Sequence, residues 1–459
     1  MTGTPTDALL TEVLPLLELD ERYASAHVLI QPGNGLPSRL ATNALACGSV
    51  AAAGLSGLAL QGGPQVVVDP RQVSVAFRSE QLTSINGRQV GAFAPLSGFF
   101  RAADGWVRTH ANYEHHERAL RALLGIDADA GRADVAAALR AWTAEDLEEE
   151  AAQLGAVVGA VRSVDRWRAH AHGRLLVTEP PVHRRRVGDA PPRSRAATGP
   201  LPLSGVRVLD LTRVIAGPVA SRDLAFAGAD VLRVDSPALQ ETGWIHLDTG
   251  QDKRSTLLDL RERADRETFE SLLSRADVLL TGYRPGALDR FGLDPEAVAA
   301  RHPGLVTGAV SAWGTSGPWR ERRGFDSIVQ AVSGIALAES ADGTTPGALP
   351  VQALDHATGH FLAAAVVLAL LEQRRDGGSI DVRISLARTA DSLLRSSDPA
   401  TTDAAAAPDE PSLPVIERTL PRPGASLAYA PPVLAFTGAP MDYRRVGGNW
   451  GSDTAAWAR

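Results

Sequence analysis

The hydrophobic positions of the second part of the chain follow an alternating pattern. From residue 201 onward, short apolar runs alternate with segments in which apolar residues recur every three or four positions. This pattern predicts strands at 206–210, 230–234, 277–280 and 305–310, and helices at 219–227, 262–275 and 295–301. Such alternation is typical of a doubly wound parallel sheet, which binds ligands at the carboxyl ends of its strands. We expect a Rossmann-like α/β domain with its site in the turns.

The region before residue 179 has a different pattern. Residues 115–124 and 133–154 have the apolar spacing of helices, and 65–69 and 106–109 are typical of short strands. We therefore expect a smaller α+β domain over 1–178. The Pro- and Arg-rich stretch at 179–200 is predicted to be a solvated linker rather than a polyanion-binding patch.

The rest of the chain divides into three parts. Residues 201–395 form the large α/β domain, and 425–459 form a closing segment. Between them, 396–424 contains four consecutive alanines with repeated Asp and Pro, which indicates a flexible tether.

Composition excludes several classes of function. The 459 residues carry a formal charge of −7, so the chain lacks the basic field that favours nucleic acid or an anionic membrane. Its single cysteine, Cys47, excludes an internal disulfide and favours a reducing compartment. We identify no signal peptide and no uncharged apolar run of 18 or more residues, so we expect a cytoplasmic protein.

The turn after the first strand of the large domain, 210–218, lacks the G-x-G-x-x-G fingerprint, and the chain has no Walker A pattern. Binding of a dinucleotide or ATP is therefore disfavoured. Later turns, at 251–255, 282–286, 314–318 and 322–326, offer arginines, an aromatic ring and backbone N–H groups. Such groups suit an adenine and its phosphates.

In order and spacing, these turns together with 203–214 and 228–231 resemble the family III CoA-transferases of the CaiB/BaiF type. The family includes formyl-CoA transferase, the carnitine and bile-acid CoA-transferases and α-methylacyl-CoA racemase. The resemblance implies transfer of CoA from an acyl-CoA to a free carboxylic acid, with no metal or redox cofactor. It places CoA contacts at Val214, Leu258, Gly282, Tyr283, Arg290 and Arg323, with Arg284 a further phosphate candidate.

The resemblance places the nucleophile at Asp355, just before an apolar helical run at 360–371. From the residues alone, Asp355 is predicted to be the N-cap of that helix, a position that would keep its carboxylate ionised. The implied chemistry passes through an aspartyl–acyl anhydride and an aspartyl-CoA thioester. Candidate oxyanion donors lie at Gly314 and Gly317. Gly87 and Gly91 could belong to a mobile loop, although we favour a plain turn there.

Two alternatives accompany this interpretation. The racemase branch requires a histidine before the aspartate of the Gly-x-Asp turn, where this chain has Phe325, so a 2-methylacyl-CoA racemase is the weaker prediction. The other alternative is a non-catalytic acyl-CoA-binding or partner subunit. The histidines at 110, 115 and 116 are interpreted as a surface cluster rather than a metal site.

The order of the domains departs from the family. Segments at 104–109, 140–142 and 154–161 resemble the family's small domain, which normally follows the large one, and 65–80 resembles the end of a large domain. Either permutation or truncation of a duplicated protein would explain this order. Family members form interlocked homodimers, so we expect a homodimer that could be interlocked, or pairing with a paralogous subunit. Residues 1–195 could then cover Asp355.

Overall fold

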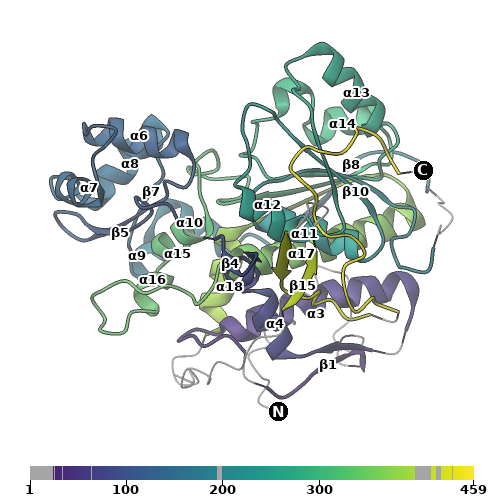
Figure 1. Ribbon diagram of the computed structural model, residues 1–459, viewed down its shortest axis with the longest axis horizontal. Helices are drawn as coiled ribbons and strands as arrows, with labels where there is room; N and C mark the ends of the chain where they lie inside the picture. The colour runs from purple at the N-terminus through teal and green to yellow at the C-terminus, as the bar shows by residue number, and fades with distance from the viewer. Residues whose placement is uncertain are drawn as a thin grey trace.

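The computed structural model describes residues 24, 26–33, 35–63, 65–91, 93–193, 199–397, 415–419, 425–436 and 438–458 (Figure 1). Its largest layer is a seven-stranded sheet in the order β11-β10-β9-β12-β13-β14-β8. Strands β9 to β14 run parallel, and β8 pairs antiparallel with β14 at the edge. Their bounds are β8 Val182–Gly188, β9 Arg207–Leu211, β10 Asp230–Asp235, β11 Arg254–Leu257, β12 Val278–Thr281, β13 Val306–Ser311 and β14 Ser379–Ser385. The predicted parallel α/β sheet is confirmed.

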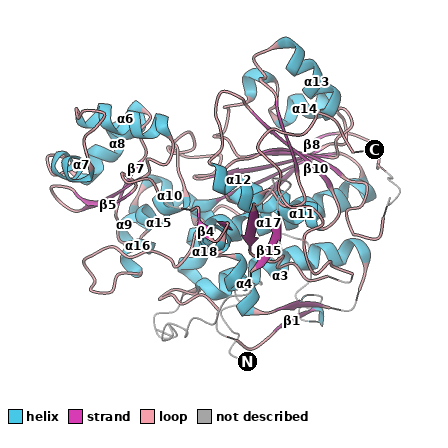
Figure 2. Ribbon diagram, in the orientation of Figure 1, coloured by secondary structure: helices cyan, strands magenta, loops and turns pink. Residues whose placement is uncertain are grey.

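Helices cover both faces of this sheet (Figure 2). Helices α11 (Ala216–Phe226) and α17 (Ala353–Asp376) lie on one face, where Val208 and Val278 point. Helices α13 (Arg263–Leu273) and α14 (Pro295–Arg301) lie on the other face with Leu209 and Leu279. Neighbouring strand residues thus face opposite layers, as the two-residue period of a strand requires. The remaining helices of this domain are α12 Gly243–Thr249, α15 Asp326–Ser333, α16 Ile335–Ala338 and α18 Leu386–Ser396, with a 3-10 turn, η2, at Asp289–Phe291.

The stretch predicted to be a linker contains strand β8, so the prediction of a solvated spacer is wrong for 182–188. Arg185 forms ion pairs with Asp381 (3.2 Å) and Glu296 (2.5 Å), and Arg184 lies 3.4 Å from Glu372. The arginines therefore face acidic side chains of the large domain while the backbone pairs with β14. Charged residues are common on edge strands because they discourage pairing with another chain.

The first part of the chain contains two structural groups. Residues 96–160 include a hydrophobic core of their own beneath a three-stranded antiparallel sheet. Figure 1 shows its helices grouped at one end of the molecule. We call 96–160 the small unit, with elements β5 Gly98–Arg101, β6 Trp106–Thr109, α6 Glu114–Leu124, α7 Arg132–Leu139, α8 Ala144–Leu154 and β7 Val158–Ala160. Two short helices, α9 Val164–Ala169 and α10 Ala171–Leu176, connect it to β8.

The segment before the small unit packs on the large domain instead. Helix α3 (Thr42–Gln61) lies against α17, and β1 (Val28–Ile30) pairs in parallel with β2 (Val66–Val68). Helices α4 (Pro70–Ala76) and α5 (Ser79–Leu82) follow. The succession α3, β2, α4 repeats the helix, strand, helix order of α17, β14, α18. This agrees with the resemblance of 65–80 to the end of a large domain.

By length and composition, α3 and α17 could each cross a membrane, but most of each apolar stretch is buried inside the protein. Such burial is typical of the core helices of a globular protein. Helix α3 nevertheless has no charged residue over its 20 positions. The expectation that the chain has no uncharged apolar run of this length therefore needs correction, although Thr, Asn, Ser and Gly interrupt the run.

Two segments far apart in sequence form a four-stranded sheet in the order β15-β16-β3-β4. Strand β15 (Ile416–Thr419) lies within the predicted tether, of which 398–414 and 420–424 are outside the described residues. Strands β3 (Ser84–Ile85) and β4 (Arg88–Gln89) are joined by Asn86 and Gly87, both with positive φ. Positive φ at both positions is typical of a two-residue hairpin turn, the alternative favoured above for Gly87. Strand β16 (Ser426–Tyr429) belongs to the closing segment.

Candidate active site

A cavity of about 200 Å³ opens at the carboxyl ends of β9, β12 and β13. Its lining comes from the large domain and from the small unit. Six of the residues singled out from the sequence line it: Val214, Gly282, Tyr283, Arg284, Arg323 and Asp355. The other six candidates, Leu258, Arg290, Gly314, Gly317, Gly87 and Gly91, are not among its lining residues. The structure thus brings the nucleophile candidate together with five of the seven predicted CoA-binding residues, Arg284 included.

Asp355 is the third residue of α17, and the N-cap position belongs to Gln352. The prediction that Asp355 caps the helix is wrong. Its backbone N–H instead donates to Oδ2 of Asp326, at 2.9 Å. Asp326 begins α15, and its other oxygen accepts a hydrogen bond from Gln330. A carboxylate from another helix therefore occupies the capping role, and the Asp355 side chain is left to face the cavity.

The electrostatics of Asp355 also differ from the expectation. Its pKa lies well above the ordinary value, because the carboxyl is buried and because Asp326 and Glu80 are close. The pKa of Asp326 is also raised, again mainly by burial. Burial and like charges outweigh the helix start, since a desolvated carboxylate beside other carboxylates is disfavoured. Asp355 thus holds its proton more tightly than a carboxyl exposed to water.

Two arginines bring positive charge to the cavity. Arg284 donates to the backbone oxygen of Glu321 (3.0 Å), and burial and the charge of Arg284 lower the pKa of Arg323. Within the part of the chain that the structure describes, neither guanidinium forms an ion pair with a carboxylate. Two like charges that face a cavity without a counter-ion favour an anionic ligand, and guanidinium groups match phosphate geometry.

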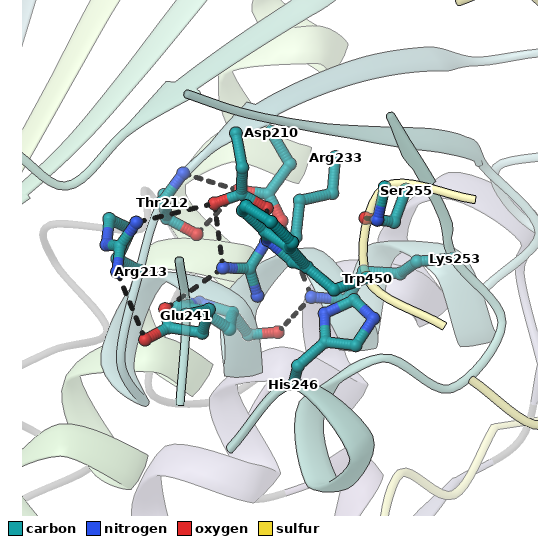
Figure 3. Close-up of polar contacts among 12 residues, drawn as sticks. Asp210, Thr212, Arg213, Arg233, Glu241, His246, Lys253, Ser255 and Trp450 are labelled. Carbon is teal, nitrogen blue, oxygen red and sulfur yellow. Dashed lines mark hydrogen bonds and ion pairs between the residues drawn. The ribbon is translucent and has the colours of Figure 1, made fainter. Parts of the chain in front are cut away.

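A buried polar network holds the turn after β9 (Figure 3). Val214 has a φ of 67°, a strained conformation for a β-branched residue, and its N–H donates to Glu241 at 3.1 Å. Figure 3 shows Arg213 and Arg233 converging on Glu241, at 3.4 and 3.0 Å. Arg233 also makes two hydrogen bonds to Asp235, at 2.7 and 3.0 Å. The network therefore fixes two cavity residues, Arg213 and Val214.

The only lysine of the chain, Lys253, makes hydrogen bonds with residues that follow the same turn. Its ammonium donates to Ser221 Oγ (2.6 Å) and to the backbone oxygen of Pro218 (2.8 Å), and it lies 3.4 Å from Asp210. Burial lowers the pKa of Lys253 to about 8. Lys253 is not among the cavity-lining residues, so its place is structural.

The small unit supplies the opposite side of the cavity through Tyr113, His115 and His116. The hydroxyl of Tyr113 donates to Glu241 at 2.7 Å, which links the small unit to the polar network. The ring of His110 stacks on Phe325 with 3.6 Å between centroids. His110 and His116 are buried, so the prediction of a surface histidine cluster is wrong. Burial and nearby cations lower the pKa of His116 to about 3, which keeps it neutral.

Several of these lining residues were not predicted. Tyr113, His115 and His116 belong to a separate unit, and Arg213, Arg320 and Arg322 lie beside residues that were predicted. Local patterns show that 114–124 is helical but not which domain its first turn faces. No group of three or more potential ligands among the described residues could hold a metal ion.

A comparison with known protein families finds one family model that matches the large domain. Residues 203–420 match the family model described as CoA-transferase family III. This part of the chain, just under half of its length, is similar to CoA-transferase family III. The residues that the resemblance singled out between 214 and 355 lie within the matched segment.

The named relatives of the chain include proteins from bacteria and a mammal. The chain is 34% identical over 198 residues to a probable fatty acyl-CoA transferase of Mycobacterium tuberculosis, covering 40% of this chain and 50% of the relative. It is 33% identical over 213 residues to the succinyl-CoA–L-malate CoA-transferase alpha subunit of Chloroflexus aurantiacus, covering 42% and 49%. It is 32% identical over 200 residues to the succinyl-CoA:glutarate CoA-transferase of Mus musculus, covering 40% and 45%.

A crystal structure of the Mycobacterium tuberculosis protein Rv3272 is 33% identical, with a TM-score of 0.41, and the match covers 43% of this chain and 57% of that chain. The chain spans about half the length of the curated relatives it matches.

Proposed function

We propose that the protein transfers CoA between an acyl-CoA and a free carboxylic acid, with Asp355 as the nucleophile. The observation that carries this proposal is the cavity, which contains Asp355 together with Tyr283, Arg284 and Arg323. In this proposal the acyl thioester reaches the carboxyl there, and the CoA phosphates meet the two guanidinium groups. The similarity of 203–420 to CoA-transferase family III supports the same reaction.

The proposed reaction starts with ionised Asp355. One carboxylate oxygen attacks the thioester carbonyl, the C–S bond breaks, and CoA leaves as the thiolate. The thiolate then attacks the carbonyl carbon of Asp355 in the resulting anhydride, which releases the first acid and leaves an aspartyl-CoA thioester. The acceptor carboxylate attacks that thioester and receives CoA through a second anhydride. These steps require neither a metal nor a redox cofactor.

The direct test of this mechanism is to trap the acylated enzyme. Purified protein is incubated with an acyl-CoA, quenched with hydroxylamine, and mapped by mass spectrometry. We expect a hydroxamate at Asp355 and, with a free acid present, formation of the new acyl-CoA. A non-catalytic acyl-CoA-binding subunit would retain CoA and give neither product.

Arg284 and Arg323, two of the arginines that line the cavity, give a prediction about binding of CoA. Replacing Arg323 with Ala should weaken CoA binding about 10- to 100-fold, since a charged group that contacts phosphate contributes about 1.5–3 kcal/mol. Isothermal titration calorimetry with CoA measures the change. Arg290→Ala is the matched comparison, because Arg290 is exposed and outside the cavity lining. An equal loss at both positions would show that the nucleotide extends beyond the cavity.

The proposal also concerns which carboxylic acids exchange CoA and which subunits associate. Among the relatives, the printed names include fatty acyl-CoA, malate and glutarate transferases, which differ in their acids. We therefore propose only the class that these names share, a carboxylic acid. The Chloroflexus relatives are named as alpha and beta subunits, which supports testing a paralogous partner beside the homodimer expected above.

A second candidate, exchange of the α-proton of a 2-methylacyl-CoA, is favoured by one observation. Position 325 is Phe rather than His, but another histidine lies close to it. His116 lines the cavity, and the centroid of its ring is 5.6 Å from that of the Phe325 ring. Its Nδ1 is buried and has no hydrogen-bond partner among the described residues, so this nitrogen is not engaged elsewhere, but its low pKa makes it a weak base.

This candidate predicts a specific isotope result. In heavy water, (2R)-2-methylacyl-CoA should gain one deuterium at C2, and His116→Ala should abolish the uptake. Mass spectrometry and NMR of the recovered thioester measure the label. If deuterium uptake is no faster than the uncatalysed exchange while CoA transfer is observed, the function is that of a transferase.

A further inference from the structure

A second cavity lies at the edge of the large sheet opposite the candidate active site. Its volume is about 640 Å³, which falls within the range of small-molecule sites. The first residues of three neighbouring strands line it, Arg207 of β9, Asp230 of β10 and Arg254 of β11. Because these strands run parallel, their amino ends meet at this edge, and the length of β9 separates it from the candidate active site by roughly 15 Å.

The C-terminal segment 438–458 contributes Arg444 and Arg445 to the lining of this cavity. Hydrogen bonds tie this segment to the sheet. The N–H of Ala458 donates to Asp230 at 2.9 Å. The N–H of Asp252, just before β11, donates to the backbone oxygen of Arg445 at 2.9 Å. Two distant parts of the chain therefore hold the arginines around one space.

Guanidinium groups outnumber carboxylates in this lining. It contains four arginines, Arg207, Arg254, Arg444 and Arg445, and two aspartates, Asp230 and Asp252. Arg254 forms an ion pair with Asp230 at 2.7 Å. Arg445 forms an ion pair at 2.8 Å with Asp453, which lies outside the lining. These two arginines thus already have a counter-charge.

The other two arginines, Arg207 and Arg444, have no carboxylate within hydrogen-bond distance of their guanidinium groups among the described residues. Nε of Arg444 is 3.6 Å from Oδ2 of Asp252, and another of its nitrogens donates to the backbone oxygen of Ala225. The contact that the structure gives the Arg207 guanidinium is with the ring of Trp457, 5.6 Å from its centroid. Charged donors that line a cavity without an acceptor favour an anionic ligand.

We propose that this cavity binds a small phosphate-bearing anion through Arg207 and Arg444, at a site separate from the CoA cavity. A phosphate group suits the site better than a carboxylate, because it presents three oxygens and about two negative charges to guanidinium groups that come from separate elements. The volume admits a molecule up to about the size of a nucleotide. Binding here does not require CoA transfer, so it is tested separately from the proposed function.

The test is protection of the arginines from phenylglyoxal, a reagent that modifies guanidinium groups. The full-length protein is treated with and without inorganic pyrophosphate, sodium chloride keeps the ionic strength equal, and mass spectrometry measures the modification of each arginine. At about ten times its Kd, pyrophosphate should slow the modification of Arg207 and Arg444 about tenfold, since about one site in ten stays free. Arg263 is the matched control, because it is an exposed arginine outside both cavities and should react at an unchanged rate.

A variant gives a second measurement at the same site. In Arg207→Gln, the pyrophosphate concentration that half-protects Arg444 should rise about tenfold, because one charged hydrogen-bond donor is lost. In Arg263→Gln, which removes the same charge elsewhere, that concentration should stay within about twofold of wild type. An equal rise in both variants would show that net charge, and not this cavity, controls binding.

The remaining outcomes identify the ligand or overturn the site. Half-protection by ADP at a lower concentration than pyrophosphate would indicate a nucleotide, and the reverse would indicate a free diphosphate; either result supports the proposal. Equal or stronger protection by citrate would overturn the assignment to phosphate. If pyrophosphate and ADP protect Arg323 but neither Arg207 nor Arg444, or protect none of them, the second site does not exist.

Discussion

Asp355→Asn should reduce CoA transfer by about 10⁴-fold or more, because the amide oxygen is a poor nucleophile and cannot form the anhydride. CoA binding should stay within a fewfold of wild type, since the amide has nearly the same shape and the guanidinium groups of Arg284 and Arg323 are unchanged. Steady-state transfer assays and calorimetry with CoA measure the two effects. Full transfer by the variant would remove Asp355 as the nucleophile.

The same substitution should also stabilise the protein at neutral pH. The folded-state pKa of Asp355 lies above its ordinary value, so the folded protein binds this proton more tightly than the unfolded chain. The resulting stability is fully present below the unfolded pKa and is lost as pH rises through the folded pKa. The Asn variant does not ionise, so its free energy of unfolding should exceed that of wild type by about 0.5–2 kcal/mol at neutral pH. Urea unfolding at acidic and neutral pH checks the pH dependence.

The second large effect is expected at Arg233. Its guanidinium is buried between Asp235 and Glu241. Arg233→Met would remove the nearer buried cation from both carboxylates and leave them, among the described residues, only the longer pairs with Arg213, at 3.8 Å to Asp235 and 3.4 Å to Glu241. Loss of one partner of a buried ion pair costs about 3–5 kcal/mol, so the free energy of unfolding should fall by that amount. Binding of CoA should weaken too, because Glu241 holds the strained Val214.

The matched control for Arg233 is Arg263→Met. Arg263 forms an exposed pair with Glu267 one turn along α13, and such pairs contribute little to stability. Chemical denaturation compares the two variants. A similar, small change in both would show that the network around Glu241 does not support the turn at Val214.

The parallel sheet could be predicted from the sequence because its strands are short apolar runs separated by amphipathic helices. The cavity residues after β12 were predicted for the same reason, since the carboxyl ends of parallel strands meet at one edge of the sheet. Strand β8 was missed because its charged residues read locally as a solvated segment. Their acidic partners, Asp381 and Glu296, lie in distant parts of the sequence.

The surroundings of Asp355 could not be predicted for a similar reason. The sequence shows an acidic residue before an apolar helix, for which an N-cap is the ordinary interpretation. That Asp326 takes the capping hydrogen bonds, and that Glu80 lies against the neighbouring His356, depends on contacts across 29 and 276 positions of the chain. Burial reversed the expected effect of the helix start on the ionisation of Asp355.

The packing of α3 along α17 limits how two copies of this protein can associate. The side of α17 that α3 occupies is already covered within one molecule, so the same side cannot receive α17 from a second molecule. Any homodimer must therefore be built on another surface. A variant that exposes this side by shortening α3 would free an apolar stripe and should associate through it.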